Sequence, residues 1–282
     1  MTQLLLLLAV VIWGATFVAS KFCLSVMSPF QLVAYRFLLA SPALFLVARL
    51  RGVSFRLGEH RRILFLASAL FSFHYLLQAW ALEYTTATNS GWLITASPLA
   101  IALLAAIFLR EPAPPAAGIL FASLGIVLLV SKGDFSNLRA LSSVGDFMVL
   151  VTTFTWAVFT IITRNPSRAL DPVVVTFVMT VPLAVSALVL PFVLDRWTPW
   201  RDLGLETGVA LGFLGFAGVA LAQWLWQRGV AKLGAAQAGL FLYLEPLATT
   251  ALAGPWLGER FGLWTAVGGV LVVLGVFIAR RT

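Results

Sequence analysis

The sequence predicts an all-α integral membrane protein in which ten transmembrane helices form two inverted five-helix repeats. Three observations predict this fold: the scarcity of charge, ten long apolar runs, and a similarity between the two halves of the chain. Of the 282 residues, 61% are hydrophobic and only 11% are charged, and the mean hydropathy is +0.98. A soluble domain carries about 25% charged residues, so a globule of this composition would expose large apolar patches to water. A water-soluble fold is therefore excluded. A disordered chain, which would be poor in apolar residues, is excluded too.

The apolar runs are long enough to cross a bilayer, which takes about 20 residues of helix. The run nearest the N-terminus has no Lys or Arg before it and no small-residue cleavage site after it, so we expect a retained first span rather than a signal peptide. The loops leave no room for a soluble domain. The single cysteine, Cys23, allows neither an internal disulfide nor a multi-cysteine metal site. The predicted spans are 4–24, 30–50, 62–82, 87–109, 113–131, 145–164, 172–194, 207–228, 234–257 and 261–279.

The net charge of +8 is explained by membrane topology rather than by nucleic-acid binding. The basic residues occupy short clusters between apolar runs, and an aromatic-studded basic face is absent. Because cytoplasmic loops carry an excess of Lys and Arg, this distribution predicts cytoplasmic termini and, for a bacterial protein, a place in the inner membrane. Twelve basic residues then lie inside and six outside. The inside set is Arg49, Arg51, Arg56, Arg61, Arg62, Arg110, Arg164, Arg168, Arg228, Lys232, Arg280 and Arg281; the outside set is Lys21, Lys132, Arg139, Arg196, Arg201 and Arg260.

The two halves of the chain match when one is shifted onto the other. A shift of 143 residues places Trp13 on Trp156 and Lys21 on Arg164, and a shift of 148 aligns the fourth span with the ninth. We therefore divide the chain into repeats at 1–137 and 138–282. Five spans is an odd number, so the second repeat enters the membrane from the opposite side. The 148-residue shift gives nine identities in thirty positions, at Ala87, Gly91, Pro98, Leu99, Ala100, Leu104, Ala105, Leu109 and Glu111.

Gly and Pro interrupt equivalent spans of the two repeats, as Gly91 and Pro98 in the first and Gly239 and Pro246 in the second. Inverted repeats are a transporter architecture, and such interrupted helices point to its binding site near the bilayer midplane. Each proline removes a backbone donor and frees a carbonyl, which favours a hinge. The alternative is that these residues are packing kinks without a role in transport.

Several short motifs together resemble the drug/metabolite transporter superfamily, and within it the EamA-type exporters, most closely the YddG-type aromatic amino-acid exporters. They are the WGATF segment at 13–17, the Arg36-Phe37 pair, the PLA steps after Gly91 and Gly239, and the LREP and LGER ends of the fourth and ninth spans. The resemblance covers the whole chain. It implies a central cavity lined mainly by the first, third, fourth, sixth, eighth and ninth helices, which opens alternately to the two sides, and it implies no cofactor.

Ionisable and amide side chains inside spans are costly, so each is a candidate for function. Glu245, directly before Pro246, is a candidate to bind a substrate amino group or carry a proton; alternatively it bonds to a kinked backbone. Arg36 is expected to snorkel outward or to pair with an acid such as Glu83; the alternative is contact with the substrate. The remaining candidates form one-turn pairs on equivalent helices, which suit a hydrated cavity or, alternatively, interhelical hydrogen bonds. They are His74 with Gln78 and Gln223 with Gln227.

Four aromatic residues within spans complete the predicted substrate site: Trp13, Trp92, Trp156 and Tyr243. Flat apolar walls with a few polar groups suit an apolar or aromatic solute, and aromatic faces attract an ammonium group. Lipid contact or packing is the alternative for each. Trp197 and Trp200 are expected to be interfacial anchors.

Together these features predict a secondary transporter that exports amino acids, aromatic or large apolar ones, across the inner membrane by alternating access. Its partners would be the amino acid and the lipid bilayer, with no nucleic acid, cofactor or metal, and the oligomeric state is left open. The alternatives are an exporter of other small metabolites or drugs and a membrane-embedded enzyme. Asn89, Ser90 and Gly91 with His74 loosely resemble a serine and histidine dyad. No oxyanion site, metal-protease motif or phosphate loop accompanies them. A channel is disfavoured because no filter-like run is visible.

Overall fold

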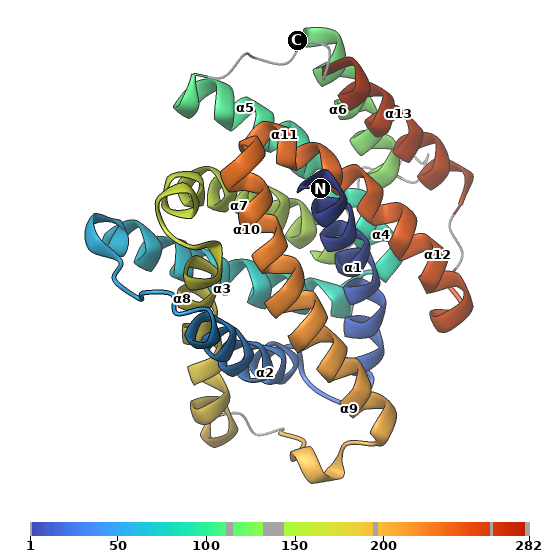
Figure 1. Cartoon of the computed structure of the whole chain (residues 1–282). Helices are drawn as coiled ribbons and strands as arrows, with labels where there is room; N and C mark the ends of the chain where they lie inside the picture. Colours follow the sequence, from blue (N-terminus) through green and yellow to red (C-terminus); the bar gives the residue numbers. More distant parts are fainter. Residues whose placement is uncertain (1, 111–114, 132–143, 194–196, 260–261, 280–282) are drawn as a thin grey trace.

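The computed structural model describes residues 2–110, 115–131, 144–193, 197–259 and 262–279, and within these ranges every regular element is helical, as predicted (Figure 1). Six helical stretches there are long and apolar enough to cross a membrane, and shorter apolar helices accompany them. The six are Thr2–Cys23, Pro29–Leu50, Gly58–Tyr84, Ala87–Leu109, Val144–Ala169 and Leu205–Leu233. Outside the described residues lie Glu111 of the repeat match and Lys132, Arg139, Arg196, Arg260, Arg280 and Arg281 of the predicted topology.

Each predicted span contains at least one helical element. Up to Ser131 the elements are α1 (Thr2–Cys23), α2 (Pro29–Leu50), η1 (Gly58–His60), α3 (Arg61–Tyr84), α4 (Ala87–Leu93), η2 (Ile94–Ala96), α5 (Ser97–Leu109) and α6 (Ala116–Ser131). From Val144 they are α7 (Val144–Ala169), α8 (Pro172–Val189), η4 (Leu190–Phe192), η5 (Trp200–Asp202), α9 (Leu205–Gly212), η6 (Phe213–Leu221), α10 (Ala222–Leu233), α11 (Ala235–Gly239), η7 (Leu240–Leu244), α12 (Glu245–Leu257) and α13 (Leu263–Ala279).

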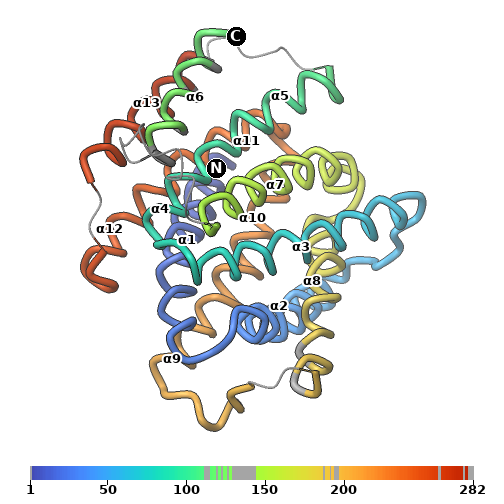
Figure 2. Tube along the Cα trace, turned by 180° about the vertical axis from the view of Figure 1, so that it is seen from behind, coloured from blue at the N-terminus to red at the C-terminus, as the bar shows by residue number. Residues whose placement is uncertain are grey.

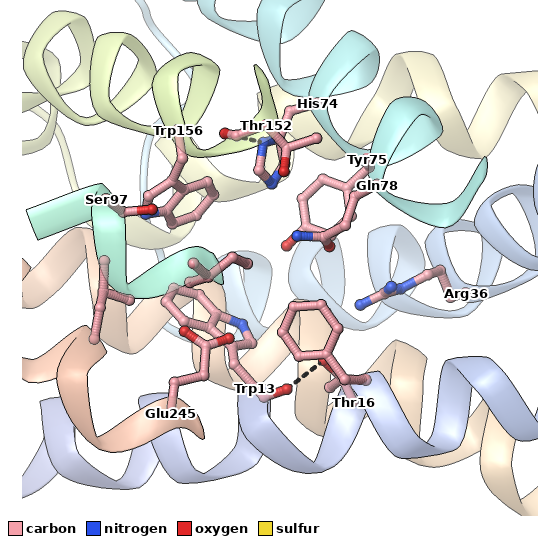
Figure 3. Close-up of a pocket in the computed structure, with 13 residues that line it drawn as sticks. Trp13, Thr16, Arg36, His74, Tyr75, Gln78, Ser97, Thr152, Trp156 and Glu245 are labelled. Atoms are coloured by element: carbon pink, nitrogen blue, oxygen red, sulfur yellow. Dashed lines mark hydrogen bonds between the residues drawn. The ribbon is translucent and has the colours of Figure 1, made fainter. Parts of the chain in front are cut away.

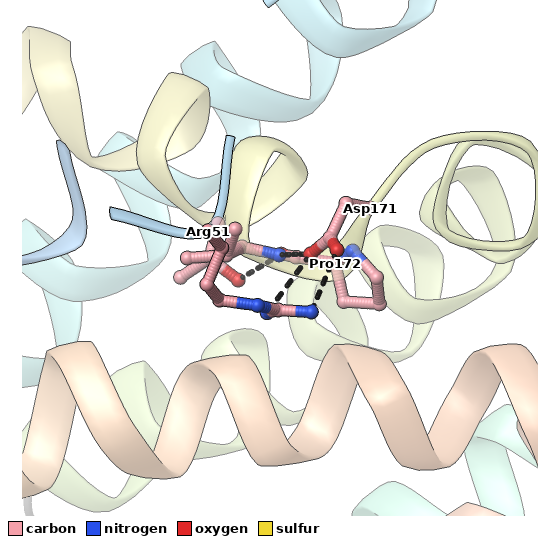
Figure 4. A network of polar contacts seen from close by, with 5 residues as sticks. Arg51, Asp171 and Pro172 are labelled. Atoms are coloured by element: carbon pink, nitrogen blue, oxygen red, sulfur yellow. Dashed lines mark hydrogen bonds and ion pairs between the residues drawn. The ribbon is translucent and has the colours of Figure 1, made fainter. Parts of the chain in front are cut away.

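α2 and α8 begin in the same way, with a polar N-cap followed by proline. Ser28 accepts a hydrogen bond from the backbone N–H of Gln31, and Asp171 accepts one from Val173. Proline suits the next position because its fixed φ is helical and its missing N–H would have no partner there. Asp171 also forms an ion pair of 3.0 Å with Arg51, at the end of α2 (Figure 4). We call this end of the bundle the Arg51 end.

The opposite end, which we call the Lys21 end, is joined by hydrogen bonds between four helices. Lys21 of α1 donates to the backbone carbonyls of Leu82 and Thr85 at 2.5 and 2.8 Å. Asp146 of α7 accepts from the Thr85 hydroxyl and the Asn89 amide, both at 2.5 Å. The Glu259 carboxylate, beyond α12, accepts from the first backbone N–H groups of α4, at 2.9 and 2.8 Å. A carboxylate is stabilising there because the N–H groups of a helix start lack intrahelical partners.

The fourth and ninth predicted spans are interrupted helices, as their Gly and Pro residues predict. A 3₁₀ turn, η2, separates α4 from α5, and η7 separates α11 from α12. Pro98 and Pro246 each follow directly, in the first turn of α5 and of α12. A proline is tolerated in a first turn, so the helix restarts at each interruption. The predicted eighth span is not one continuous α-helix, because Phe213–Leu221 between α9 and α10 is a π-helix.

The two interrupted helices lie side by side and antiparallel at the centre of the bundle. α4 contacts α12, α5 contacts α11, and η2 contacts η7. The approach of α4 to α12 depends on Gly91, because a Cβ there would lie 2.8 Å from the hydroxyl oxygen of Thr249. Thr249 in turn donates to the carbonyl of Gly14 at 3.1 Å and so joins α12 to α1.

The remaining helices pack around this centre in pairs. α3 lies beside α7 and α2 beside α8, while α6 and α13 form a separate pair at one side (Figures 1 and 2). α6 and α13 approach each other closely at Gly125, where an added Cβ would lie only 2.5 Å from the carbonyl oxygen of Gly268. A glycine at this position therefore allows the approach. Both helices also carry large exposed apolar side chains, among them Leu120 and Val270. Small residues that allow close backbone approach, with apolar groups facing outward, are typical of helices packed in lipid.

Gly14 is the tightest position between α1 and α12. A Cβ added at Gly14 would lie 2.6 Å from both the Cβ of Ala248 and the carbonyl oxygen of Glu245. We expect Gly14→Ala to lower the free energy of unfolding by about 1–3 kcal/mol through overpacking. Gly212→Ala is the matched control because its added Cβ meets nothing within 4 Å. It should raise stability by up to about 1 kcal/mol. Thermal unfolding of both variants in the same detergent measures the difference; equal effects would contradict the packing.

Candidate functional site

A cavity lies at the centre of the bundle, beside the interruptions of the two antiparallel helices (Figure 3). It holds about 420 Å³ of space that is not filled by atoms, including space open to the exterior, and its walls come from α1, α2, α3, α7 and the two interrupted helices. The wall combines aromatic side chains with polar and charged ones. The lining residues are Trp13, Thr16, Phe17, Arg36, His74, Tyr75, Gln78, Ile94, Ser97, Thr152, Trp156, Leu242 and Glu245.

The structure brings five of the nine predicted substrate residues together around this cavity: Trp13, His74, Gln78, Trp156 and Glu245. They come from four different helices, so their proximity is a product of the fold and not of sequence spacing. Glu245 and Ser97, which match under the 148-residue shift, both line the cavity. Each directly precedes the proline that restarts its helix, so the two interruptions face the same space.

Trp92 and Tyr243 do not line this cavity, contrary to prediction. The indole N–H of Trp92 donates to the Thr250 hydroxyl at 3.1 Å. Its ring occupies the space beside Gly269 of α13, where a Cβ would meet the ring at 2.0 Å. Tyr243 is buried in the same apolar cluster as Trp92. Both therefore have the packing role that the sequence left as their alternative.

Gln223 and Gln227 are also placed away from the cavity. Both are fully buried on α10, and the Ser167 hydroxyl of α7 donates to the side-chain oxygen of Gln227 at 2.7 Å. Gln227 thus forms the interhelical hydrogen bond that was the alternative to substrate contact. The amide group of Gln223 has no hydrogen-bond partner within the described part of the chain. The one-turn spacing correctly predicts that both glutamines face the interior of the bundle. It does not show that they face other helices instead of the cavity.

His74 is held in the cavity wall by α7. Its Nδ1 lies 3.0 Å from the Thr155 hydroxyl and 3.1 Å from the Thr152 carbonyl oxygen. The ring also contacts Trp156, with 5.1 Å between the ring centroids. Ser90 is bonded elsewhere, since its hydroxyl donates to the Thr86 carbonyl at 2.9 Å. Ser90 and His74 therefore do not form the serine and histidine dyad that the alternative of a membrane-embedded enzyme requires.

Arg36 contradicts the prediction that it snorkels outward or pairs with Glu83. It is buried, and its guanidinium carbon lies 5.0 Å from the ring centre of Tyr75. Figure 3 shows the guanidinium pointing into the cavity. Among the described residues no carboxylate forms an ion pair with Arg36, and Glu83 is exposed. The aromatic face provides part of the stabilisation that the predicted acid would have given.

Three tryptophans are in mutual contact at one side of the cavity: Trp13 and Trp156 line it, and Trp226 packs behind them. The ring centroids are separated by 5.2 Å for Trp13 and Trp156, 5.4 Å for Trp13 and Trp226, and 5.7 Å for Trp156 and Trp226. The indole N–H of Trp13 also donates to the carbonyl of Gly218 in the π-helix, at 3.0 Å. Sequence reasoning missed Trp226, although it lies three residues after Gln223 on the same face of α10. It also missed Tyr75 and Thr152, because nothing in their local patterns separates them from ordinary span residues, and Thr16, which it noted only as part of the WGATF segment.

The four predicted hinge residues, Gly91, Pro98, Gly239 and Pro246, lie at or beside the interruptions. Gly239 ends α11, and a Cβ there would lie 3.3 Å from the Ile101 side chain of α5. The prolines begin new helical segments and the glycines allow close packing. A hinge role for them stays a prediction. Within the described residues, no group of three or more His, Cys, Asp or Glu side chains is arranged to hold a metal ion.

Comparison with known proteins assigns the chain to a family. The model of the EamA-like transporter family matches residues 1–131 and again 143–281. The chain belongs to the EamA-like transporter family. An uncharacterized transporter of Archaeoglobus fulgidus is 32% identical over 281 residues, 98% of this chain and 96% of that protein. The uncharacterized transporter YyaM of Bacillus subtilis is 26% identical over 273 residues, 94% of this chain and 89% of YyaM.

A solved crystal structure shares the fold, with a TM-score of 0.73, 23% sequence identity and coverage of 99% of this chain and 98% of that one. The EamA-family chain described here is therefore a membrane transporter of small molecules. Its central cavity, which combines aromatic walls with charged groups, is the candidate solute site.

The tryptophan cluster is expected to support the cavity wall. Trp226 is fully buried, so Trp226→Ala should leave a void beside Trp13 and Trp156. We expect the free energy of unfolding to fall by about 3–5 kcal/mol. Trp256→Ala is the matched control, since Trp256 is 75% exposed, and its effect should stay within about 0.5 kcal/mol. Denaturant unfolding in detergent checks both; a small loss for Trp226→Ala would mean that this wall collapses readily or is loosely packed.

Proposed function

We propose that this EamA-family transporter exports amino acids, aromatic or large apolar ones, by alternating access of the central cavity across a bacterial inner membrane. The observation that carries the proposal is the pair of opposite charges in one cavity. Arg36 and Glu245 are both 4% exposed, and both line the same space. Export of another small metabolite or drug of the superfamily is the alternative.

Neither charge is neutralised by the protein within the described part of the chain. Arg36 lies over the rings of Phe37 and Tyr75 and has no carboxylate partner there, and the Glu245 carboxylate has no hydrogen-bond or ion-pair partner there. Figure 3 shows the two side chains on different sides of the cavity. A buried charge without a counter-charge is costly, by about 2.5–3.5 kcal/mol on membrane-insertion scales. A zwitterion offsets both costs, with its carboxylate toward Arg36 and its ammonium group toward Glu245.

The aromatic walls support a large apolar or aromatic side chain on that zwitterion. Trp13, Phe17, Tyr75 and Trp156 present rings to the same cavity. Small-molecule sites combine apolar walls with a few polar groups that fix orientation, and aromatic faces also attract an ammonium group. A cationic drug would suit Glu245 and the rings, but it would place a second positive charge beside Arg36. The presence of Arg36 therefore favours the zwitterion over the organic cation.

We propose that ten spans form two inverted repeats, 1–137 and 138–282, and two findings support this division. The family model matches two successive segments of nearly equal length. The helix contacts are also symmetric under exchange of the repeats: α1 packs on α10 and α12 as α7 packs on α3 and α5, and the equivalent helices α2 and α8, and α6 and α13, pair directly. The antiparallel course of the interrupted helices agrees with opposite insertion of the two repeats.

The same topology gives the orientation. The Arg51 end of the bundle carries the basic clusters, including Arg49, Arg51, Arg228 and Lys232. By the positive-inside rule we place this end, and both termini, in the cytoplasm. The Lys21 end then faces outward.

Loss of either cavity charge should impair transport. We expect Glu245→Gln and Arg36→Gln each to lower the rate of amino-acid counterflow in proteoliposomes by at least about tenfold. The reason is that a hydrogen bond to a charged group contributes about 1.5–3 kcal/mol, and 1.4 kcal/mol is a factor of ten. Glu83→Gln and Arg61→Gln, which neutralise exposed residues outside the cavity, should transport as the parent protein does. Unchanged transport in both cavity variants would remove the charge pair from the mechanism.

The substrate class is tested by counterflow with a panel of solutes. We expect Phe, Trp, Tyr and Leu to exchange, and their amides or decarboxylated amines to fail, because the analogues lack the carboxylate that Arg36 would bind. Nucleotide sugars and quaternary ammonium drugs complete the panel. Movement of either class without amino acids would overturn the substrate assignment, whereas the family and the fold would stand.

A further inference from the structure

A second pocket lies at the Arg51 end, between the end of α2, the α7–α8 connection and the end of α10. It holds about 760 Å³ of empty space, including space open to the exterior. We call it the Arg51 pocket. It shares no lining residue with the central cavity. Its lining residues are Arg51, Ser167, Arg168, Leu170, Asp171, Pro172, Trp224, Arg228, Ala231 and Lys232.

The Arg51 pocket has a large excess of positive charge. Four basic side chains face one carboxylate, Asp171, which gives a net charge of +3. Asp171 is already engaged, since it pairs with Arg51 at 3.0 Å and caps α8 through the Val173 N–H at 2.9 Å (Figure 4). Within the described residues, Arg228 and Lys232 have no ion-pair partner. Two cations therefore line a pocket whose only acid is committed elsewhere, and this arrangement suits an anion.

One wall of the Arg51 pocket is apolar. The guanidinium of Arg51 lies 5.5 Å from the ring centre of Trp224, which packs in an apolar cluster with Phe177. Phe177 contacts Phe45 of α2, with 5.6 Å between the ring centroids, and Phe45 is exposed at the bundle surface. An apolar surface thus continues from the charged pocket to the side of the bundle. A ligand with an anionic group and a hydrocarbon chain fits both parts.

The basic character is confined to one of the two ends. A shift of 143 places Asp171 and Pro172 on Ser28 and Pro29, so the two helix starts are equivalent, but it places Arg168 on Ser25. The 148-residue shift places Arg228 on Trp80 and Lys232 on Tyr84. The equivalent positions at the Lys21 end are therefore occupied by one serine and two aromatic residues, none of them charged. The basic side chains of the Arg51 pocket are therefore not needed for the helix packing that both ends share. We infer that they serve a function specific to the Arg51 end.

We propose that the Arg51 pocket binds the phosphate group of an anionic membrane phospholipid. Arg228, Lys232 and Arg168 would surround the phosphate oxygens, with Arg51 held above Trp224 at the rim. The acyl chains would follow the Phe177–Phe45 surface. Basic pockets between helix ends on the cytoplasmic side are suited to anionic headgroups, which are attracted by about 1 kcal/mol per basic residue near the surface. Inorganic phosphate shares the headgroup chemistry but lacks the chains, so it separates the two sources.

The test measures thermal unfolding of the delipidated full-length protein in a neutral detergent. Phosphatidylglycerol is added in one arm, phosphatidylcholine in the second, and inorganic phosphate at the same concentration in the third. Phosphatidylglycerol should raise the unfolding temperature by at least about 3 °C more than either other addition, because a ligand that binds only the folded state stabilises it. Bound lipid phosphorus, counted after gel filtration, should show retention of phosphatidylglycerol.

The double variant Arg228→Gln/Lys232→Gln should lose this shift and the retained phosphorus. The matched control is Arg61→Gln/Arg62→Gln, which removes the same charge at the same end from exposed residues outside the pocket, and it should keep both. Arg228→Lys/Lys232→Arg, which keeps the charges, should restore the shift and so exclude a folding defect. Equal shifts with phosphatidylcholine, an equal shift with inorganic phosphate, or loss in the Arg61/Arg62 control would each overturn the lipid site. None of these results depends on the transported solute.

Discussion

The cost of leaving charged or unpaired polar groups in hydrocarbon governs this structure. A lipid-facing wall offers no hydrogen bonds, so polar side chains must bond to each other or face an internal space. At the Lys21 end they bond to each other: Lys21, Asp146 and Glu259 join carbonyls, hydroxyls and helix-start N–H groups of separate helices. In the middle of the bundle Arg36 and Glu245 have no such partners among the described residues. Both line the central cavity, which is the candidate solute site.

The cavity lies beside the interruptions of the two helices. At this point along the bundle the 3₁₀ turns meet and α1 packs closely on α12. The 3₁₀ turns η2 and η7 contact each other where α4–α5 and α11–α12 pass. Thr249 donates to the carbonyls of both Gly14 and Glu245, each at 3.1 Å, and so holds α1 against the restarted helix. Gly14 and Gly91 allow this contact because neither position has room for a Cβ. If the interruptions act as the hinges we predict, their movement would therefore shift α1 and its Trp13 together, as the proposed alternating access requires.

The sequence predicted the helical fold and about half of the site, for identifiable reasons. Apolar length predicts a span, and Gly with Pro at matching places in the fourth and ninth spans predicts the interruptions, so Pro98, Pro246 and the adjacent Glu245 were found. Proline alone is not sufficient, since Pro42 and Pro182 lie inside continuous helices. The helices of a membrane protein are apolar all round, so periodicity does not separate a cavity face from a packed face. Trp92 and Gln227 were misassigned for this reason, and Trp226 was overlooked. Arg36 was misassigned because its aromatic partner, Tyr75, lies on a different helix. The π-helix at Phe213–Leu221 has no local signal at all.

The positions at which the two proposed repeats differ include both charged residues of the central cavity. Shifts of 148 and 143 place Glu245 on Ser97 and Arg36 on Met179, so neither cavity charge has a charged equivalent. A faithful repeat of Glu245 at position 97 would put two carboxylates in one cavity, because Ser97 also lines it. Two carboxylates in the same cavity would repel each other because the surrounding medium has a low dielectric constant, and both would need a cation. Replacing one member of each pair leaves one positive and one negative group at different places on the wall. In the transporter we propose, the symmetry of the backbone would allow two states to exchange, while the broken side-chain symmetry would give the solute a single orientation in the cavity.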